Sequence, residues 1–352
     1  MTAARALGLL LGVAADGVFT RAGFGKRLVR SSLTRQLTNS LPSVVAVSPR
    51  VRSELVAVTS LLAGVLAEKG IQKRPVLQTL VTAATTWSVL GAANLIEEGT
   101  RFSRQLEKED FTSARKTLAQ VEMSSLSLVT KESATAFDVS TSDFNANDFN
   151  TGGANAISRN KEASAARLEV IGLSRAGIET VARETVDVVV SPLLYGAVAG
   201  IPGLIFSQMV ISRDISSLDR VREKLLEIAR FLPTRFASLL TVVSAPIVGG
   251  SSEAARQAWK RDVIAHPQPN TASVQASFAG ALQVRIGGRT EHSYGVVESS
   301  VLGDGRNPDA GHVIRAVELS RLVGWFAGMT SAVLALIFRL PTRGKPKKYL
   351  LC

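Results

Sequence analysis

The residues best suited to chemistry lie in the stretch Arg261–Gly288, which reads RDVIAHPQPNTASVQASFAGALQVRIGG. His266 could act as an acid, a base or a phosphate ligand. The two prolines that follow it fix an extended, turn-like backbone, and Asn270 is expected to cap the next helix. The pair Gly287–Gly288 is expected to end that helix. A lone His in a loop is more often an ordinary polar surface residue, so both interpretations stay open.

A second group of ionisable residues occurs in IETVARETVDVVVSP, at the mouth of an apolar run. It contains Glu179, Arg183, Glu184 and Asp187. Ionisable groups that enter a membrane span are costly and often functional. The alternative is an amphipathic helix at the membrane interface, stabilised by pairs such as Glu179–Arg183 at a spacing of four residues. Taken alone, the pattern favours the interfacial helix.

A third polar group follows in VLGDGRNPDAGHVIRAVELSRLVGW. The sequence around Asp304, Gly-Asp-Gly, predicts a tight turn, and Asp309 is expected to cap the helix that follows. Arg315 and Arg321 could bind a phosphate beside the turn carboxylate. They could equally be basic anchors at the membrane boundary.

Several kinds of site are excluded by the residue inventory. The single Cys is Cys352, so no intrachain disulfide or Cys-based zinc cluster is possible. The three His residues, at 266, 292 and 312, show no metal-ligand spacing. No P-loop, GxSxG or HExxH motif is present, so the motifs alone name no reaction and no metal site is predicted.

The composition indicates a membrane protein. Hydrophobic residues make up 46% of the 352 residues, only 20% are charged, and the net charge is +12. Nucleic acid is one explanation for so basic a chain. However, the basic residues are scattered between apolar runs and aromatic residues make up only 5%, so no base-stacking surface is indicated and no nucleic-acid partner is expected. Basic loops that orient a membrane protein are the better explanation.

Apolar runs along the chain predict an all-α, polytopic membrane protein with amphipathic helices, forming a single membrane domain over residues 1–352. Pro75–Ile96 carries no charge and is long enough to span a bilayer. Val188–Ser212 is also uncharged, but its prolines predict either one kinked span or a re-entrant hairpin. Phe236–Ser252 and Leu322–Phe338 are shorter plausible spans. The runs at residues 5–19 and 55–67 are shorter still.

The first run, at residues 5–19, could be a cleaved signal peptide or a retained membrane helix. A retained helix is favoured because further apolar runs follow. The basic segments Arg21–Arg52 and the C-terminal tail are both expected in the cytoplasm. Residues 124–167 are rich in Ser, Thr, Asn, Asp and Gly, which predicts a flexible polar insert within the domain.

Taken together, these segments resemble the CobD/CbiB family, the adenosylcobinamide-phosphate synthases of cobalamin biosynthesis. ETVARETVDVVVSPLLYGAVAGIPG, LGDGRNP followed by IRAVELSRLV, and ARALGLLLGVAADGVF are each similar to a block of that family. The resemblance covers nearly the whole chain except the polar insert. In the first stretch it rests on Arg261, Asp262, His266, Pro267, Pro269, Asn270, Ala279, Gly280, Ala281, Leu282, Val284, Arg285, Gly287 and Gly288.

The chain departs from the family pattern at polar positions. After Phe19 the family's GDP and HPV motifs are missing, and its GRD segment is replaced by the polar insert. Arg183 places a cation where the family has a carboxylate, and Gln275 stands where the family has Glu. The apolar and turn framework is kept, which is the pattern expected when a fold is retained while catalysis is relaxed or changed.

The resemblance implies a multi-pass plasma-membrane ligase of corrin metabolism that joins adenosylcobyric acid to an aminopropanol phosphate. ATP would supply activation and Mg²⁺ would be held by carboxylates. The alternative is a non-catalytic descendant that acts as a membrane scaffold, sensor or partner-binding protein. The residues that the resemblance assigns to catalysis are Asp187, His266 and Asn270, and those assigned to substrate binding are Arg261, Asp262, Arg285 and Asp304. Among these, Asp187 and Asp304 are the candidates for holding magnesium or for a structural role.

Overall fold

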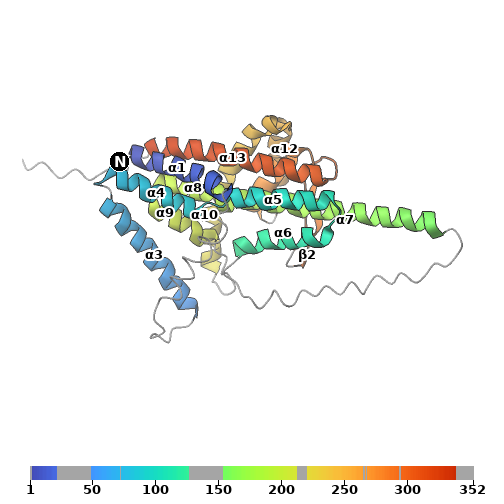
Figure 1. Cartoon of the computed structure of the whole chain (residues 1–352), viewed down its shortest axis with the longest axis horizontal. Coiled ribbons are helices and arrows are strands. Elements are labelled where there is room, and N and C mark those ends of the chain that lie inside the picture. Colours follow the sequence, from blue (N-terminus) through green and yellow to red (C-terminus); the bar gives the residue numbers. More distant parts are fainter. Residues whose placement is uncertain are drawn as a thin grey trace, which may run out of the picture.

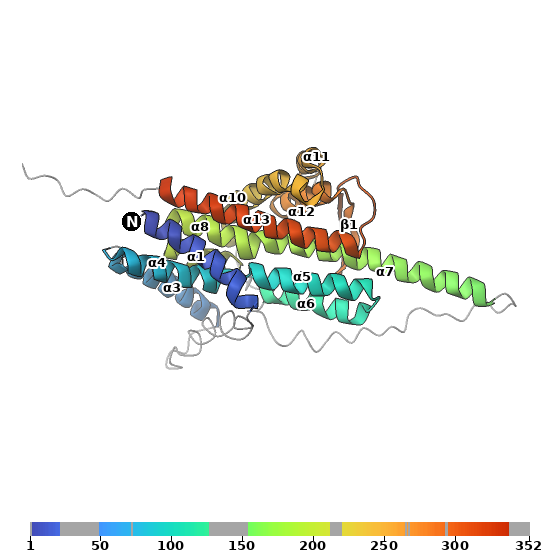
Figure 2. The same cartoon turned by 45° about the horizontal axis from the view of Figure 1, so that its top comes forward.

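Helices make up almost all of the described structure, which confirms the predicted all-α class (Figure 1). The computed structural model describes residues 2–21, 49–71, 73–126, 154–211, 220–264, 266, 268–292 and 295–337. Both views show α7 and α13 side by side along the long axis, with α1 and α4 near one end and α5 and α6 near the other (Figure 2).

The helices and strands have the following bounds: α1 Thr2–Arg21, α3 Pro49–Ile71, α4 Pro75–Val89, α5 Ala92–Glu107, α6 Phe111–Leu126, α7 Ala154–Thr185, the π-helix η2 Val186–Val190, α8 Ser191–Ala199, α9 Ile201–Ile211, α10 Arg220–Ser244, the 3-10 helix η3 Ala245–Val248, α11 Ser252–Asp262, α12 Pro269–Leu282, β1 Ile286–His292, β2 Gly295–Leu302 and α13 Ala310–Ile337.

The protein is a membrane protein. Within the described residues, three helical segments are long and apolar enough to cross a bilayer: Pro75–Glu107, Glu227–Val248 and Ala310–Ile337. They contain or overlap the predicted runs at 75–96, 236–252 and 322–338. Large apolar side chains on α1, α10 and α13 face outwards, as expected where lipid replaces water around the protein.

The predicted run Val188–Ser212 folds back on itself and is not one kinked span. Gly200 separates α8 from α9 and has φ +69°, a left-handed conformation that favours glycine. Tyr195 of α8 and Phe206 of α9 then meet edge to face, with ring centroids 5.1 Å apart. Of the two alternatives that the sequence leaves open, the structure has the helical hairpin.

The helix α1 packs tightly against α4 and α13. Its two glycines at a spacing of four, Gly8 and Gly12, lie against Thr82 and Thr86 of α4. A Cβ atom added at Gly12 would lie 2.5 Å from the Cβ of Thr86, so only glycine permits this approach. Small residues at this spacing are the usual means of close helix packing in membranes.

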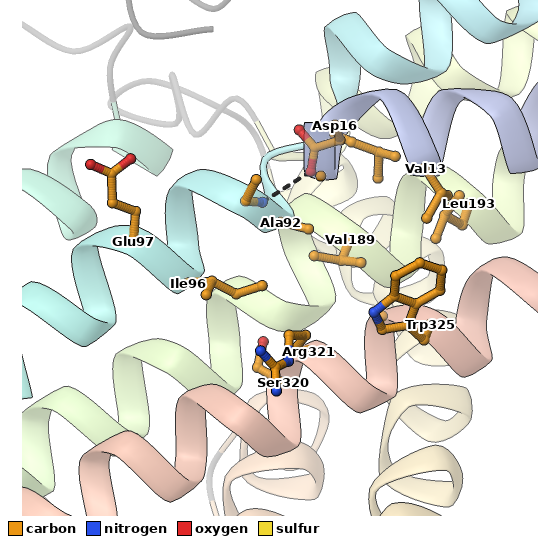
Figure 3. A pocket seen from close by; sticks show the side chains of 14 residues that line it. Val13, Asp16, Ala92, Ile96, Glu97, Val189, Leu193, Ser320, Arg321 and Trp325 are labelled. Atoms are coloured by element: carbon orange, nitrogen blue, oxygen red, sulfur yellow. Dashed lines mark hydrogen bonds between the residues drawn. The ribbon is translucent and has the colours of Figure 1, made fainter. Parts of the chain in front are cut away.

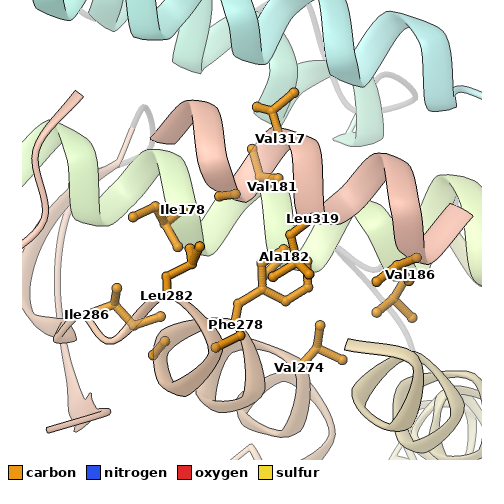
Figure 4. Packing of buried hydrophobic residues seen from close by; sticks show 14 of the residues in the cluster. Ile178, Val181, Ala182, Val186, Val274, Phe278, Leu282, Ile286, Val317 and Leu319 are labelled. Atoms are coloured by element: carbon orange, nitrogen blue, oxygen red, sulfur yellow. The ribbon is translucent and has the colours of Figure 1, made fainter. Parts of the chain in front are cut away.

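The helix α12 is the centre of the core. All its residues from 272 to 282 are buried, enclosed by α7, α10, α11 and α13. Figure 4 shows Phe278 of α12 beside Leu319 of α13 and Ala182 of α7. Removing a fully buried Phe side chain from such a site typically costs about 3–5 kcal/mol. The FAGAL sequence therefore has a packing role, whatever else its neighbours do.

Two predictions about the ends of α12 are wrong. The helix ends at Leu282 because Gln283 takes a left-handed conformation, φ 56°, and not because of the glycine pair. Gly287 and Gly288 lie in β1, which pairs antiparallel with β2 and has an irregularity at this point. At the other end, Gln268 is the N-cap residue and Asn270 lies inside the first turn.

The predicted polar insert at 124–167 is covered only in part. Leu126 ends α6, and α7 begins at Ala154, so the remaining residues 127–153 lie outside the described residues. The insert therefore stays a prediction. The basic segments at 22–48 and 338–352, on which the predicted orientation depends, also lie outside the described residues.

Candidate functional site

The first group of predicted site residues connects α11 to the turn after β2. The Asp262 carboxylate accepts a hydrogen bond from the Gly303 amide at 2.7 Å and one from the Arg261 guanidinium at 2.6 Å. Arg261 also pairs with Asp304. Only 7% of the Asp262 side chain is exposed, against 50% for Arg261 and 77% for Asp304. Asp262 therefore holds the turn in place, while Arg261 and Asp304 face solvent.

The second group surrounds the π-helix η2. The Asp187 carboxylate lies 3.6 Å from the Arg230 guanidinium of α10, and both side chains are largely buried. Asn270 and Arg183 line the same small pocket, which has a volume of about 20 Å³. The Asn270 amide donates to the Glu227 carbonyl at 3.0 Å, so it ties α12 to α10 and does not cap its own helix. A π-helical turn often marks a functional site.

His266 lies on the segment that joins α11 to α12. Its Nδ1 accepts a hydrogen bond from the Gln268 amide at 3.0 Å. In the neutral ring the proton therefore sits on Nε2. Burial lowers the pKa of His266 below its ordinary value, and the negative charge of Glu179 partly opposes that effect. In this tautomer Nε2–H is the available group, and it can donate a hydrogen bond to a phosphate or carboxylate oxygen.

Glu179 is a site residue that the interfacial-helix interpretation misplaced. It is buried, and its carboxylate accepts a hydrogen bond from the Gly287 amide at 2.6 Å. Glu184 and Asp187 are buried as well. The C-terminal part of α7 thus lies inside the protein and not on the membrane surface, so that interpretation is wrong. The cost of burying ionisable groups was the signal that pointed to this segment.

Arg285 stands apart from both groups. Its backbone amide donates to the Arg306 carbonyl at 2.9 Å, which joins the chain after α12 to the segment before α13. Its side chain is exposed and bonds to none of the described residues. An exposed guanidinium of this kind can bind a carboxylate or phosphate from solution.

The two carboxylates that are candidates for holding magnesium or for a structural role, Asp187 and Asp304, lie near different parts of α12. Asp187 shares a pocket with Asn270, whereas Gly303, next to Asp304, abuts Ala279. Nine helical residues separate Asn270 from Ala279, a rise of about 13 Å. In the described part of the chain, no group of three or more His, Cys, Asp or Glu residues could hold a metal ion. The residues do not fit a Mg²⁺ ion held jointly by Asp187 and Asp304.

The predictions about Arg315 and Asp309 have different outcomes. Asp309 accepts a hydrogen bond from the His312 amide at 3.1 Å and so caps α13 as predicted. Arg315 donates to the carbonyls of Val248 and Gly249, at 3.2 Å and 3.0 Å. It therefore caps the end of η3 and is not grouped with Asp304 around a phosphate.

Comparison with known proteins gives the same family as the sequence blocks. The model of the family described as CobD/Cbib protein matches residues 223–320, which contain α11, α12 and the hairpin. The cobalamin biosynthesis protein CobD of Mycobacterium tuberculosis is 31% identical over 354 residues, covering 95% of this chain and 96% of the relative. The chain belongs to the CobD/CbiB family.

Two other relatives match less of the chain. The cobalamin biosynthesis protein CobD of Clostridium perfringens is 25% identical over 75% of this chain, and that of Brucella suis is 32% identical over 49%. No solved structure matches the chain. The CobD/CbiB segment matched by the family model includes six of the seven predicted site residues, because only Asp187 lies before residue 223.

Proposed function

We propose that this CobD/CbiB member acts in cobalamin biosynthesis, where it joins adenosylcobyric acid to an aminopropanol or its phosphate to give adenosylcobinamide or its phosphate. The observation that carries the proposal is the similarity over 95% of the chain to a relative named for cobalamin biosynthesis. The aligned region includes the His266 loop and the buried helix α12.

The proposed roles follow from burial. Arg285 and Asp304 are exposed and are the groups that would contact the propionate and amide side chains of a corrinoid. Asp187, held by Arg230, is the group that would orient the amine and accept its proton as the amide forms. His266 would donate its Nε2–H to an oxygen of the substrate. Asp262 has a positioning role, because its carboxylate is used by the Gly303 turn.

Amide formation from a carboxylic acid requires activation of that acid. ATP is the activating cosubstrate that the family implies, and it is part of the proposal. Its Mg²⁺ would need ligands other than a joint Asp187–Asp304 pair. We further propose that the protein crosses the plasma membrane several times, with the corrinoid and the amine as its soluble partners.

A non-catalytic role is the second candidate, and one observation favours it. The pocket around Asp187 is only about 20 Å³, and Arg183 and Arg230 both line it. The neighbouring cations and the small volume leave the Asp187 carboxylate little room for a substrate.

Complementation separates the two candidates. A host that lacks its own synthase, grown on cobyric acid, should be restored by this chain but not by His266→Ala at equal abundance. His292→Ala, in β1, is the matched control and should restore growth. Wild-type chain that inserts in the membrane yet never restores growth would contradict the enzymatic proposal and favour a scaffold or sensor.

A further inference from the structure

A cavity of about 430 Å³ lies between α1, α5, α8 and α13, and it contains none of the seven residues assigned to catalysis or substrate binding. Its walls are mainly apolar, and Figure 3 shows residues from these helices facing one space. Pockets that bind small molecules typically have volumes of about 300–1,000 Å³. The apolar residues that form the walls are Val13, Leu90, Ile96, Val189, Leu193 and Trp325.

Three charged residues line the cavity, and each one ends an uncharged run. Asp16 follows residues 6–15 of α1, Glu97 follows the uncharged residues 75–96, and Arg321 precedes residues 322–337 of α13. A charge at the end of an apolar run marks the boundary between the hydrocarbon and the headgroups. Three such boundaries converge here, so the cavity lies at the depth of lipid headgroups.

The charges have both signs. Arg321 is exposed, and a guanidinium binds phosphate oxygens well. Asp16 is buried and accepts a hydrogen bond from the Ala93 amide at 2.9 Å, while the partly exposed Glu97 lies 3.7 Å from Arg101. Carboxylates in these positions can still accept hydrogen bonds from a primary ammonium group. The matching ligand carries a phosphate and a primary amine at one end.

The other end of the ligand must be apolar. From the cavity, Trp325, Met329, Val333 and Leu336 form an exposed stripe along α13, at the spacing of one helical face. A free aminoalkyl phosphate has nothing to cover the apolar walls or this stripe, whereas an acyl chain covers both.

We propose that this cavity binds one phospholipid with an aminoalkyl phosphate headgroup, as in phosphatidylethanolamine. The phosphate lies against Arg321, the ammonium lies towards Asp16 and Glu97, and an acyl chain follows α13. This site is independent of the proposed reaction, since it shares no residue with the His266 loop.

Quenching of Trp325 fluorescence tests the proposal on the full chain in bilayers. The chain has three Trp residues, so Trp87→Phe with Trp259→Phe leaves Trp325 as the only reporter. Lipids with brominated acyl chains quench it on contact. Brominated phosphatidylethanolamine should quench at a mole fraction roughly fivefold lower than brominated phosphatidylcholine or phosphatidylglycerol, the effect of a few partly exposed charge contacts. Phosphatidylcholine lacks N–H donors, and phosphatidylglycerol lacks the amine.

Matched variants assign the selectivity to the cavity. Glu97→Gln, which weakens the ammonium contact, should bring the phosphatidylethanolamine curve close to the phosphatidylcholine curve. Arg321→Gln, which removes the contact to the phosphate that all three lipids carry, should move all three curves to higher mole fractions. Glu98→Gln and Arg104→Gln, on α5 but outside the cavity, should leave the difference unchanged. Equal quenching by all three lipids, selectivity that survives Glu97→Gln, or quenching curves that Arg321→Gln leaves in place would overturn the proposal. Free phosphoethanolamine that relieves the quenching would also overturn it, because the site would then take a soluble aminoalkyl phosphate.

Discussion

The contacts of Asp262 allow a graded prediction that separates a structural carboxylate from an accessible one. In Asp262→Ala the Gly303 amide loses its acceptor, which lies 2.7 Å away at a side chain only 7% exposed. Leaving a buried donor unsatisfied, together with the loss of a charge-assisted bond, costs about 2–3 kcal/mol. Asp304→Ala removes only a pair between exposed groups, and such pairs contribute little because water and salt screen them.

The assay is thermal unfolding of the full chain in detergent. The readout is the fraction of the protein that remains monodisperse as the temperature is raised. For Asp262→Ala the midpoint should fall by roughly 5 °C, since 1 kcal/mol shifts it by a few degrees in chains of this size class. For Asp304→Ala it should not change, so any loss of function there would report a lost substrate contact. Equal midpoints for the two variants, or a larger fall for Asp304→Ala, would refute the assignment of Asp262 to the turn.

Two further predictions concern His266 and α1. Burial lowers the pKa of His266, so the folded protein favours the neutral ring. The neutral ring's contribution to the free energy of unfolding is complete above the unfolded pKa of about 6.5, and it is lost as pH falls through the lower pKa of the folded state. In NMR titrations, the imidazole signal of His266 is the one that disappears in His266→Gln, and it should titrate below pH 6.5. In Glu179→Gln the pKa of His266 should be lower still, and a higher pKa in that variant would show that the Glu179 charge does not act on His266. Gly12→Ala should lower the unfolding midpoint, because its Cβ would lie 2.5 Å from Thr86 and overpacking costs about 1–3 kcal/mol. Gly17→Ala, with no atom within 4 Å of its added Cβ, should leave the midpoint unchanged or raise it, and equal effects of the two would contradict the α1–α4 contact.

The features that the sequence predicts well are those set by local composition. Long uncharged runs such as Pro75–Ile96 predict membrane helices because the bilayer requires about 20 apolar residues per span. Asp309 also caps α13 as predicted, because a cap depends on residues within one helical turn. The family blocks point to the segment that contains α11 and α12 for the same reason, since their order along the chain can be read directly.

What the sequence does not predict depends on contacts between distant segments. Glu179 looks like half of a surface pair at a spacing of four, yet its carboxylate binds the amide of Gly287, far along the chain. Asn270 is a residue type common at helix N-caps, but its side-chain amide donates a hydrogen bond to a backbone carbonyl of α10. The end of α12 at Gln283 could not be predicted either, because a left-handed Gln is uncommon without tertiary support. Such outcomes are decided by packing and not by local propensity.

Direct detection of the product tests the central claim most simply. Membranes that contain the full chain are incubated with adenosylcobyric acid, aminopropanol phosphate, ATP and Mg²⁺, and the corrinoids are analysed by mass spectrometry. The proposed function predicts the amide-linked product with wild-type chain and with His292→Ala, and none with His266→Ala of the same unfolding midpoint. Folded wild-type chain that leaves adenosylcobyric acid unchanged, with both aminopropanol and its phosphate, would contradict it.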